Sequence, residues 1–258
     1  MDPAPAPRLA LTSAGEGSPL VLVHGFTQTG ASLVGLADRL SGTHRVMRPD
    51  LPGHGASPPA TGDLHEAARS LGATCGTASY VGYSLGGRVC VHLALDRPDL
   101  VTRLVLVSAT AGIEDEAGRR ARRAADEALA DRIESGGDEG LARFLDEWLA
   151  GPLFSHLTEE QADRSSRLAN RAGGLAGSLR HHGTGTQQPL WGRLSELSMP
   201  VLVLAGERDE RFCRLGRRLS EAVGPNAVFA PVAGAGHAVA FERPEETARI
   251  LGAFLRDG

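Results

Sequence analysis

The five residues GYSLG, at positions 82–86, match the pattern G-x-S-x-G, and their neighbours supply the context that this pattern needs. An apolar run at residues 79–82 leads into the motif, and a helical pattern extends from Leu85 to about Leu95. Glycines at both ends allow the crowded strand-to-helix turn that exposes a nucleophilic serine. We therefore predict that Ser84 is a nucleophile at the carboxyl end of a buried strand.

Short apolar runs like the one before Ser84 recur along the chain. They lie at residues 20–24, 45–48, 104–108, 201–205 and 227–230. Helical patterns occur at about residues 31–40 and 85–95, and a closing helix is expected at about residues 244–255. Buried strands alternating with helices indicate an α/β fold, with a mostly parallel central sheet that is flanked by helices on both faces.

The alternation stops at residues 113–197, which have helical periodicity and no clear strand. This stretch is rich in alanine, arginine and acidic residues, and it holds both tryptophans, Trp148 and Trp191. An insertion here would lie over the carboxyl ends of the strands, where open α/β sheets bind ligands. We therefore expect a core formed by residues 1–112 and 198–258, with a helical cap inserted between strands at residues 113–197.

Composition excludes several classes of function. The chain has 258 residues and a formal charge of −4, which favours neither a nucleic-acid partner nor an anionic membrane. All 27 Lys and Arg residues are arginines, so a Schiff-base lysine, a pyridoxal-phosphate anchor and a P-loop lysine are excluded. The start has no signal-peptide pattern, and no apolar run approaches the roughly 18 residues of a membrane span. We expect a cytoplasmic monomer or small homo-oligomer.

A serine nucleophile at neutral pH needs a general base and a carboxylate that orients it. Asp209 comes just after one predicted strand, and His237 just after the last one. The chain order serine, acid, histidine is that of enzymes with a nucleophile elbow. Glu207 is the rival for the acid, and Asp209 is preferred because it lies further out in its loop. The predicted triad is therefore Ser84, Asp209 and His237.

The first predicted strand ends in the loop HGFT, at residues 24–27. An oxyanion hole in such enzymes takes one backbone N–H from this loop and one from the residue after the nucleophile. These donors are Phe26 and Leu85. His24 is expected to support the loop and to take no part in the chemistry.

No metal site is predicted. Cys75, Cys90 and Cys213 lack the C-x-x-C spacing of zinc sites. The adjacent His181 and His182 point in different directions on a helix and have no acid at ligand spacing, so we expect both to face solvent. Asp38, Asp96 and Asp99 are expected to be ordinary helix and loop acids.

Two arginines are predicted to face the nucleophile. Arg88 lies in the first turn of the helix after Ser84, where a cation opposes the helix dipole, and this placement indicates an anionic substrate. Arg122 shares a helix face with Leu129 and Ile133, seven and eleven positions later, so it points to the underside of the cap. Arginines in this position suit a substrate with several carboxylates.

The chain resembles the α/β-hydrolase superfamily over nearly its full length. Within that superfamily it is similar to the 2-succinyl-6-hydroxy-2,4-cyclohexadiene-1-carboxylate (SHCHC) synthases of menaquinone biosynthesis. Cap sequences vary widely across the superfamily, so the matching cap segments discriminate best. The matching segments are residues 24–30 (HGFTQTG), 50–55 (DLPGHG), 82–88 (GYSLGGR), 122–130 (RRAADEALA), 148–154 (WLAGPLF) and 183–191 (GTGTQQPLW).

The resemblance implies a carbon–oxygen lyase that releases pyruvate from a small polycarboxylate without a metal or organic cofactor. It implies that the serine, made basic by its histidine, removes a proton beside the succinyl ketone. The residues that match substrate-binding positions are Tyr83, Arg88, Arg122, Trp148 and Arg167. Arg167 rests mainly on this resemblance, and Arg164 or Arg171 could replace it.

Two other functions are compatible with the same triad. The first is a serine carboxylesterase or carbon–carbon bond hydrolase that acts on an anionic substrate through an acyl-enzyme. The second is a ligand-binding protein that has lost catalysis, against which the intact triad argues.

Overall fold

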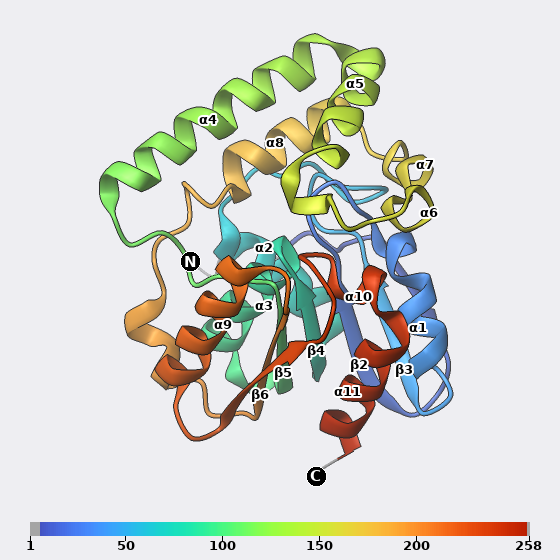
Figure 1. The fold of residues 1–258 in the computed structure, drawn as a ribbon, viewed down its shortest axis with the longest axis vertical. Coiled ribbons are helices and arrows are strands. Elements are labelled where there is room, and N and C mark those ends of the chain that lie inside the picture. Colours follow the sequence, from blue (N-terminus) through green and yellow to red (C-terminus); the bar gives the residue numbers. More distant parts are fainter. Residues whose placement is uncertain (1–5, 257–258) are drawn as a thin grey trace.

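The structure is a computed structural model that describes residues 6–256, and a seven-stranded sheet forms its centre (Figure 1). The strands are β1 (Leu11–Ala14), β2 (Ser18–Val23), β3 (His44–Pro49), β4 (Ala78–Tyr83), β5 (Val101–Val107), β6 (Val201–Gly206) and β7 (Ala227–Val232). Their order is β1-β3-β2-β4-β5-β6-β7. The edge strand β1 is antiparallel to β3, and the remaining neighbours are parallel. The predicted α/β fold class is confirmed.

Helices cover both faces of this sheet. One face packs against α2 (Leu64–Cys75), α3 (Leu85–Asp96) and α9 (Glu210–Val223), and the other against α1 (Val34–Leu40) and α11 (Pro244–Arg256). Shorter pieces are α10 (Val239–Glu242) and the 3₁₀ turns at Gly30–Leu33, Pro98–Leu100 and Trp191–Glu196. Successive strand residues serve opposite faces, so Val21 joins the first apolar layer and Leu22 the second.

Between β5 and β6 the chain leaves the sheet and forms a layer of helices above it (Figure 1). These are α4 (Glu116–Ser135), α5 (Gly137–Leu149), α6 (Glu159–Ala162), α7 (Arg164–Arg167) and α8 (Ala172–His182), with a 3₁₀ turn at Pro152–Phe154. The layer has an apolar core of its own, in which Ile133, Leu145 and Leu175 are fully buried. We call residues 113–197 the cap.

None of the helices within residues 6–256 combines the length and the apolar composition that a membrane crossing requires.

Candidate active site

Ser84 occupies a strained turn between β4 and α3. Its backbone has φ 51° and ψ −108°, a conformation that L-residues rarely adopt. The two motif glycines make the turn possible, because a Cβ on Gly82 would lie 2.5 Å from the carbonyl oxygen of Gly86. A Cβ on Gly86 would lie 2.3 Å from the carbonyl oxygen of Val23. The turn therefore depends on glycine at both positions and presents the serine hydroxyl beyond the strand end.

His237 and Asp209 form a hydrogen-bonded pair. The Nδ1 atom of His237 lies 3.0 Å from Oδ2 of Asp209, whose Oδ1 accepts the N–H of Phe212 at 3.1 Å. Partial burial alone would raise the pKa of the Asp209 carboxyl, but the hydrogen bonds from His237 and Phe212 hold it below its usual range. The rival Glu207 is exposed and accepts the N–H of Gly234. Of the two candidate acids, Asp209 is therefore the one that contacts the imidazole of His237.

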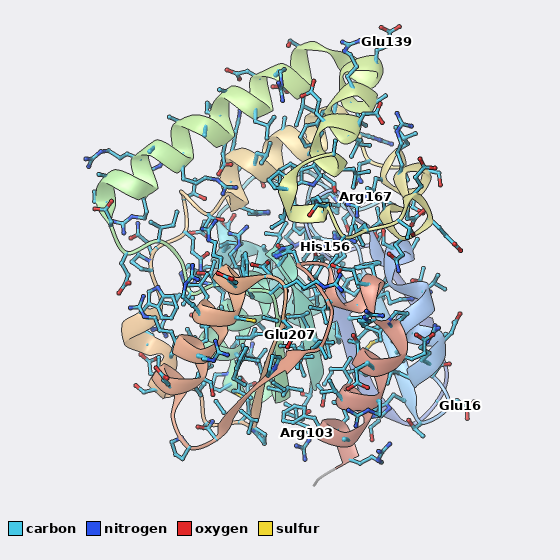
Figure 2. The ribbon with its side chains drawn as sticks, viewed as in Figure 1. Glu16, Arg103, Glu139, His156, Arg167 and Glu207 are labelled. Carbon is cyan, nitrogen blue, oxygen red and sulfur yellow. The ribbon has the colours of Figure 1, made fainter. Side chains whose placement is uncertain are left out.

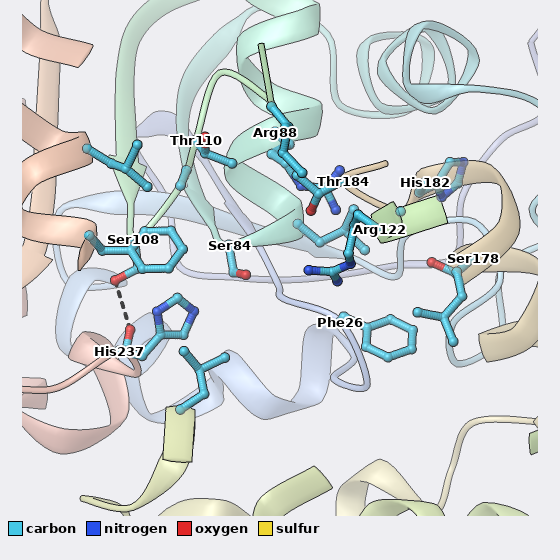
Figure 3. Close-up of a pocket in the computed structure, with 18 of the residues that line it drawn as sticks. Phe26, Ser84, Arg88, Ser108, Thr110, Arg122, Ser178, His182, Thr184 and His237 are labelled. Carbon is cyan, nitrogen blue, oxygen red and sulfur yellow. Dashed lines mark hydrogen bonds between the residues drawn. The ribbon is translucent and has the colours of Figure 1, made fainter. Parts of the chain in front are cut away.

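Ser84 and His237 line the same cavity (Figure 3). The hydroxyl of Ser108 donates to the carbonyl oxygen of His237 at 2.8 Å, and the Phe212 ring packs edge-on against the imidazole, with 4.5 Å between centroids. These contacts fix both the backbone and the ring of His237. In the part of the chain that the structure describes, no hydrogen bond joins Ser84 to His237, a contact that often tightens only when substrate is bound.

Phe26 and Leu85 border the cavity beside Ser84. Phe26 lies in a turn that is closed by two hydrogen bonds, from Gln28 N–H to the Gly25 carbonyl at 3.2 Å and from Gly25 N–H to the Gln28 side chain at 3.0 Å. Leu85 is the first residue of α3, so its N–H has no acceptor within the helix. Phe26 and Leu85 therefore border the cavity from a hydrogen-bonded turn and from the first turn of a helix.

His24 supports this loop, as expected. Its ring is buried, with Nδ1 2.8 Å from the Gly25 carbonyl oxygen and Nε2 accepting the Leu51 N–H at 2.9 Å. Burial lowers the pKa of His24 to about 4, so the ring is neutral at pH 7. A neutral ring with both nitrogens in use ties the loop after β2 to the loop after β3.

Arg88 reaches the cavity from the first turn of α3. Its side chain is buried, and Nη1 donates to Oε1 of Gln187 in the cap at 3.4 Å. Burial, together with the nearby Arg122, lowers the pKa of Arg88 to about 10, so it remains charged at neutral pH. Within residues 6–256 no carboxylate forms a salt bridge with Arg88, although Asp126 lies close enough to favour its charge, and a buried guanidinium in this state favours an anionic ligand.

Arg122 reaches the same cavity from α4 in the cap. Its Nε donates to Oδ1 of Asp126, one helical turn later, at 2.8 Å. Figure 3 shows Arg88 and Arg122 on one side of Ser84, with His237 on the other. Ser84 and His237 thus lie at one end of the cavity, and the two guanidiniums line its other end.

Arg167, the last residue of α7 in the cap, lines a smaller pocket that adjoins the first (Figure 2). Its Nε donates to the Ala162 carbonyl at 2.7 Å, Nη1 donates to the Thr27 hydroxyl, and the guanidinium lies over the Phe154 ring, 5.9 Å from its centroid. The two alternatives are placed elsewhere. Arg164 pairs with Asp146 at the surface, and Arg171 is exposed and lines a different pocket.

Aromatic side chains form the wall between the two pockets. Trp148 lines both of them and meets the Phe26 ring edge-on at 5.6 Å. Tyr83, directly before the nucleophile, lines the smaller pocket, and its burial raises the pKa of the phenol. The two aromatic residues predicted to contact substrate, Tyr83 and Trp148, therefore line a pocket beside Ser84.

The cavity lining includes polar residues that were absent from the predicted site, and three of them bear on the argument. Ser178 and His182, on the inner face of α8, line the cavity, as does Arg211 at the start of α9. The expectation that His181 and His182 both face solvent is wrong for His182, which is 2% exposed because α8 packs against α4 and the core below. Helical periodicity shows that the two histidines point in different directions, but it does not show that one face of α8 closes a cavity.

Several polar atoms in the cavity wall have no protein partner. Nε1 of Trp148, Oγ of Ser178 and Nδ1 of His182 are buried and make no hydrogen bond within residues 6–256. Burial lowers the pKa of His182 to about 3, so its ring is neutral and can offer one donor or one acceptor. Buried polar groups are rarely left unpaired, which indicates that a polar ligand is to satisfy them.

The charge of the cavity is of one sign. The arginines that line the two adjoining pockets are Arg88, Arg122, Arg167 and Arg211. Among the described residues that line these pockets, there is no aspartate or glutamate. Planar guanidiniums grip carboxylates through paired hydrogen bonds, so the site suits a ligand with several carboxylates.

Comparison with known proteins assigns the chain to a family. The sequence profile of the alpha/beta hydrolase family matches residues 20–250. A Bacillus subtilis protein named putative 2-succinyl-6-hydroxy-2,4-cyclohexadiene-1-carboxylate synthase is 34% identical over 250 residues, which cover 92% of this chain and 89% of that protein. A Salmonella agona protein named as the same synthase is 31% identical over 251 residues, covering 93% and 95% of the two chains.

Solved structures show the same similarity in three dimensions. MenH from S. aureus superposes with a TM-score of 0.87 and 28% identity, covering 97% of this chain and 98% of that one. A thermophilic esterase from Thermogutta terrifontis, solved with malate bound, superposes with a TM-score of 0.83 and 25% identity, covering 96% and 93%. The chain therefore belongs to the alpha/beta hydrolase family and is a homologue of the enzymes named 2-succinyl-6-hydroxy-2,4-cyclohexadiene-1-carboxylate synthase.

Proposed function

We propose that the protein is a lyase of menaquinone biosynthesis. It eliminates pyruvate from 2-succinyl-5-enolpyruvyl-6-hydroxy-3-cyclohexene-1-carboxylate and yields 2-succinyl-6-hydroxy-2,4-cyclohexadiene-1-carboxylate. The observation that carries this proposal is the cavity itself, in which a serine and a histidine paired with an aspartate face four arginines. The named substrate carries three carboxylates, one each on the ring, the succinyl chain and the enolpyruvyl group, and the homologues share the reaction's name.

Ser84 and His237 act together as the base. His237 takes the proton of the Ser84 hydroxyl through Nε2, and the serine oxygen removes the ring proton beside the succinyl ketone. Asp209 stabilises the imidazolium that forms, because its ionised carboxylate is hydrogen-bonded to Nδ1. The resulting negative charge moves onto the ketone oxygen as an enolate.

The backbone N–H groups of Phe26 and Leu85 hold this enolate oxygen. When the enolate collapses, the ring gains its second double bond and the carbon–oxygen bond to the enolpyruvyl group breaks. The leaving group takes up the proton that the base removed and departs as pyruvate. Atoms and charge therefore balance, and each step uses only side chains and backbone groups of this chain.

The arginines position the substrate and exclude alternative orientations. Arg88 and Arg122 lie on the side of Ser84 opposite His237, and Arg167 lies in the smaller pocket. Substrate carboxylates bound on both sides of the reacting carbon would hold that carbon over the serine oxygen. Such positioning contributes several kcal/mol to catalysis. Trp148 and Tyr83 form the apolar wall against which the ring rests.

A coupled pyruvate-release assay with the purified protein and the enolpyruvyl intermediate tests the proposal. We expect one pyruvate per substrate consumed and no pyruvate from the Ser84→Ala variant. Retained release by Ser84→Ala would mean that another group is the base, and no release by the wild-type protein would refute the assignment.

The second candidate is a carboxylesterase or carbon–carbon bond hydrolase that uses the same triad through an acyl-enzyme. Its support is the similarity in structure to an esterase from Thermogutta terrifontis. Rapid turnover of short uncharged p-nitrophenyl esters, together with no pyruvate release, would favour this candidate. Labelling of Ser84 by a fluorophosphonate, lost in Ser84→Ala, would exclude a protein that only binds its ligand.

A further inference from the structure

Two histidines and an aspartate meet on the helical face of the core, on α2 and α3. His65 lies in the first turn of α2, and His92 and Asp96 lie one turn apart near the end of α3. One ligand atom from each lies within 4.8 Å of the other two. The rings of His65 and His92 meet edge-on with 4.5 Å between centroids, and Nδ1 of His65 lies 2.5 Å from Oδ2 of Asp96.

His92 is the unusual member of this group. Its side chain is 1% exposed, and neither ring nitrogen has a hydrogen-bond partner within residues 6–256. In an imidazole, each ring nitrogen carries either an N–H donor or a free lone pair. Leaving such a group without a partner in the protein interior costs about 1–3 kcal/mol. Something that binds a ring nitrogen of His92 would remove this cost.

The surroundings allow an ion to enter and leave. The side chains of His65 and Asp96 are 43% and 28% exposed, so the group opens to solvent on their side. Nη1 of Arg193 lies 3.6 Å from Oδ1 of Asp96, the oxygen that His65 does not contact. Asp96 can thus bind an ion through Oδ2 while Arg193 orients the carboxylate through Oδ1, an arrangement common around metal ligands.

We propose that His65, His92 and Asp96 form a binding site for a divalent transition-metal ion of the zinc class. Two imidazoles and one carboxylate are a ligand set typical of zinc, and water completes a tetrahedral shell. None of the three residues lines the cavity around Ser84 or the pocket around Arg167. The ion therefore has no part in the elimination, and it joins α2 to α3, the helix that begins directly after the nucleophile.

Other metal ligands in the chain do not compete strongly with this group. Cys75, Cys90 and Cys213 are buried, and within residues 6–256 none of them belongs to a group of three or more side chains that could share one ion. Asp99, three residues after Asp96, already pairs with Arg97 through two hydrogen bonds, of 2.8 and 2.6 Å. A saturable site for one ion can therefore be assigned by mutation.

Zinc binding to the full, tag-free protein tests the proposal after metal has been removed with a chelator. Calorimetric titration with Zn²⁺ gives stoichiometry and affinity, the absorption of bound Co²⁺ reports coordination geometry, and thermal unfolding reports stabilisation. The variants are His65→Ala and Asp96→Asn, which alter partly exposed side chains and leave the buried His92 in place. Asp99→Asn is the matched control, because it removes an exposed acid three residues from Asp96.

We expect one Zn²⁺ per chain, tetrahedral Co²⁺ bands, and a rise in Tm of roughly 5–10 °C at a zinc concentration about 100 times Kd. His65→Ala and Asp96→Asn should each weaken binding at least tenfold, while Asp99→Asn should bind as the wild type does. Absence of saturable binding by the wild-type protein would overturn the proposal, as would unchanged stoichiometry and affinity in both variants. In either case the two histidines are a packing contact only.

Discussion

Asp126 accepts a hydrogen bond from Nε of Arg122 at 2.8 Å, while its other carboxyl oxygen is buried and has no hydrogen-bond partner among the described residues. Burial raises the pKa of this carboxyl, and the guanidinium of Arg122 opposes that effect. The contact uses Nε, so it leaves the two terminal nitrogens of Arg122 for a ligand. Asp126 is therefore a positioning residue, which aims the planar guanidinium into the cavity.

Arg122→Ala should lower kcat/KM for pyruvate release about 100-fold or more, which corresponds to roughly 3 kcal/mol, because a charged hydrogen bond to a carboxylate is lost. Asp126→Asn keeps the shape of the side chain and should lower kcat/KM about tenfold, mainly through KM. Arg120→Ala on the same helix is the control, since Arg120 is exposed and pairs with Glu116. A loss of less than about threefold in Arg122→Ala would show that Arg122 does not contact a substrate carboxylate.

Because the backbone of Ser84 is strained, replacing this residue with glycine should lower activity but raise stability. Ser84→Gly should abolish pyruvate release and raise the free energy of unfolding by about 1–2 kcal/mol, because glycine adopts φ 51° without steric cost. Ser84→Ala should abolish release too, but it keeps the Cβ and therefore the strain, so its stability should stay near that of the wild type. Urea denaturation of the three proteins measures this difference. Equal stability of the glycine and alanine variants would argue against strain at this turn.

The two acids that follow β6 should differ sharply in their effect on turnover. Asp209→Asn removes the carboxylate that accepts Nδ1 of His237 and should lower kcat about 10⁴-fold, as loss of the orienting acid does in serine triads. Glu207→Gln should change kcat by less than about threefold, because Glu207 is exposed and its hydrogen bond within residues 6–256 is with the Gly234 backbone N–H. Steady-state kinetics of the two variants decide between the acids. A large loss in Glu207→Gln alone would reverse the assignment.

The parts of the fold that could be predicted are those with a continuous apolar run. In strands β2 to β6 this run is largely buried, whereas β7, at the edge of the sheet, was predicted from the apolar residues 227–230 although Val232 is its one buried residue. The other edge strand, β1, was not predicted, since its four residues are all exposed and it pairs with β3 mainly through its backbone. Helices α2 and α9 were not predicted either, although Asp63 and Asp209 cap their first turns and could have signalled them.

The same contrast between local sequence signals and tertiary packing applies to the residues of the site. The motif around Ser84 and the strand ends before Asp209 and His237 carry local signals, so those residues could be predicted together. Ser178 and His182 carry none, because they reach the cavity only through the docking of α8 under α4. Helix periodicity shows which residues share a face, but the partner that covers that face is set by tertiary packing.

Buried neutral histidines should make the fold sensitive to acid. Burial lowers the pKa of His24 to about 4 and that of His54 and His182 to about 3. Below about pH 6.5 the unfolded chain binds protons that the folded chain does not, so stability is lost as pH falls from there towards the folded-state pKa values. Each such group contributes a slope of about 1.4 kcal/mol per pH unit across this window.

Removing one of these histidines should flatten the pH dependence. His182→Gln cannot take up a proton in either state, so its free energy of unfolding should fall less steeply than that of the wild type, by about 1.4 kcal/mol per pH unit between pH 6 and 4. Urea denaturation across this pH range measures the free energy of unfolding of both proteins. A difference between them that is the same at every pH reports only lost packing. Parallel curves would show that His182 is protonated in the folded protein.

Arg211 should bind substrate although it is exposed. It lines the cavity at the start of α9 and lies over the Phe212 ring, 5.8 Å from its centroid, whereas Arg214 on the same helix does not line the cavity and pairs with Glu210 at 3.7 Å. Solvent screens an exposed guanidinium, so Arg211→Ala should raise KM about fivefold, roughly 1 kcal/mol, and leave kcat unchanged.

Arg214→Ala is the matched control for this prediction. Both variants remove one positive charge from the same helix, so a general loss of attraction for an anionic substrate would raise KM equally in the two. A contact at the cavity edge raises KM in Arg211→Ala alone, and the difference between the variants should shrink as salt is added, because screening weakens the contact in the wild-type protein as well. Equal KM values in the two variants at low salt would place Arg211 outside the substrate-binding surface.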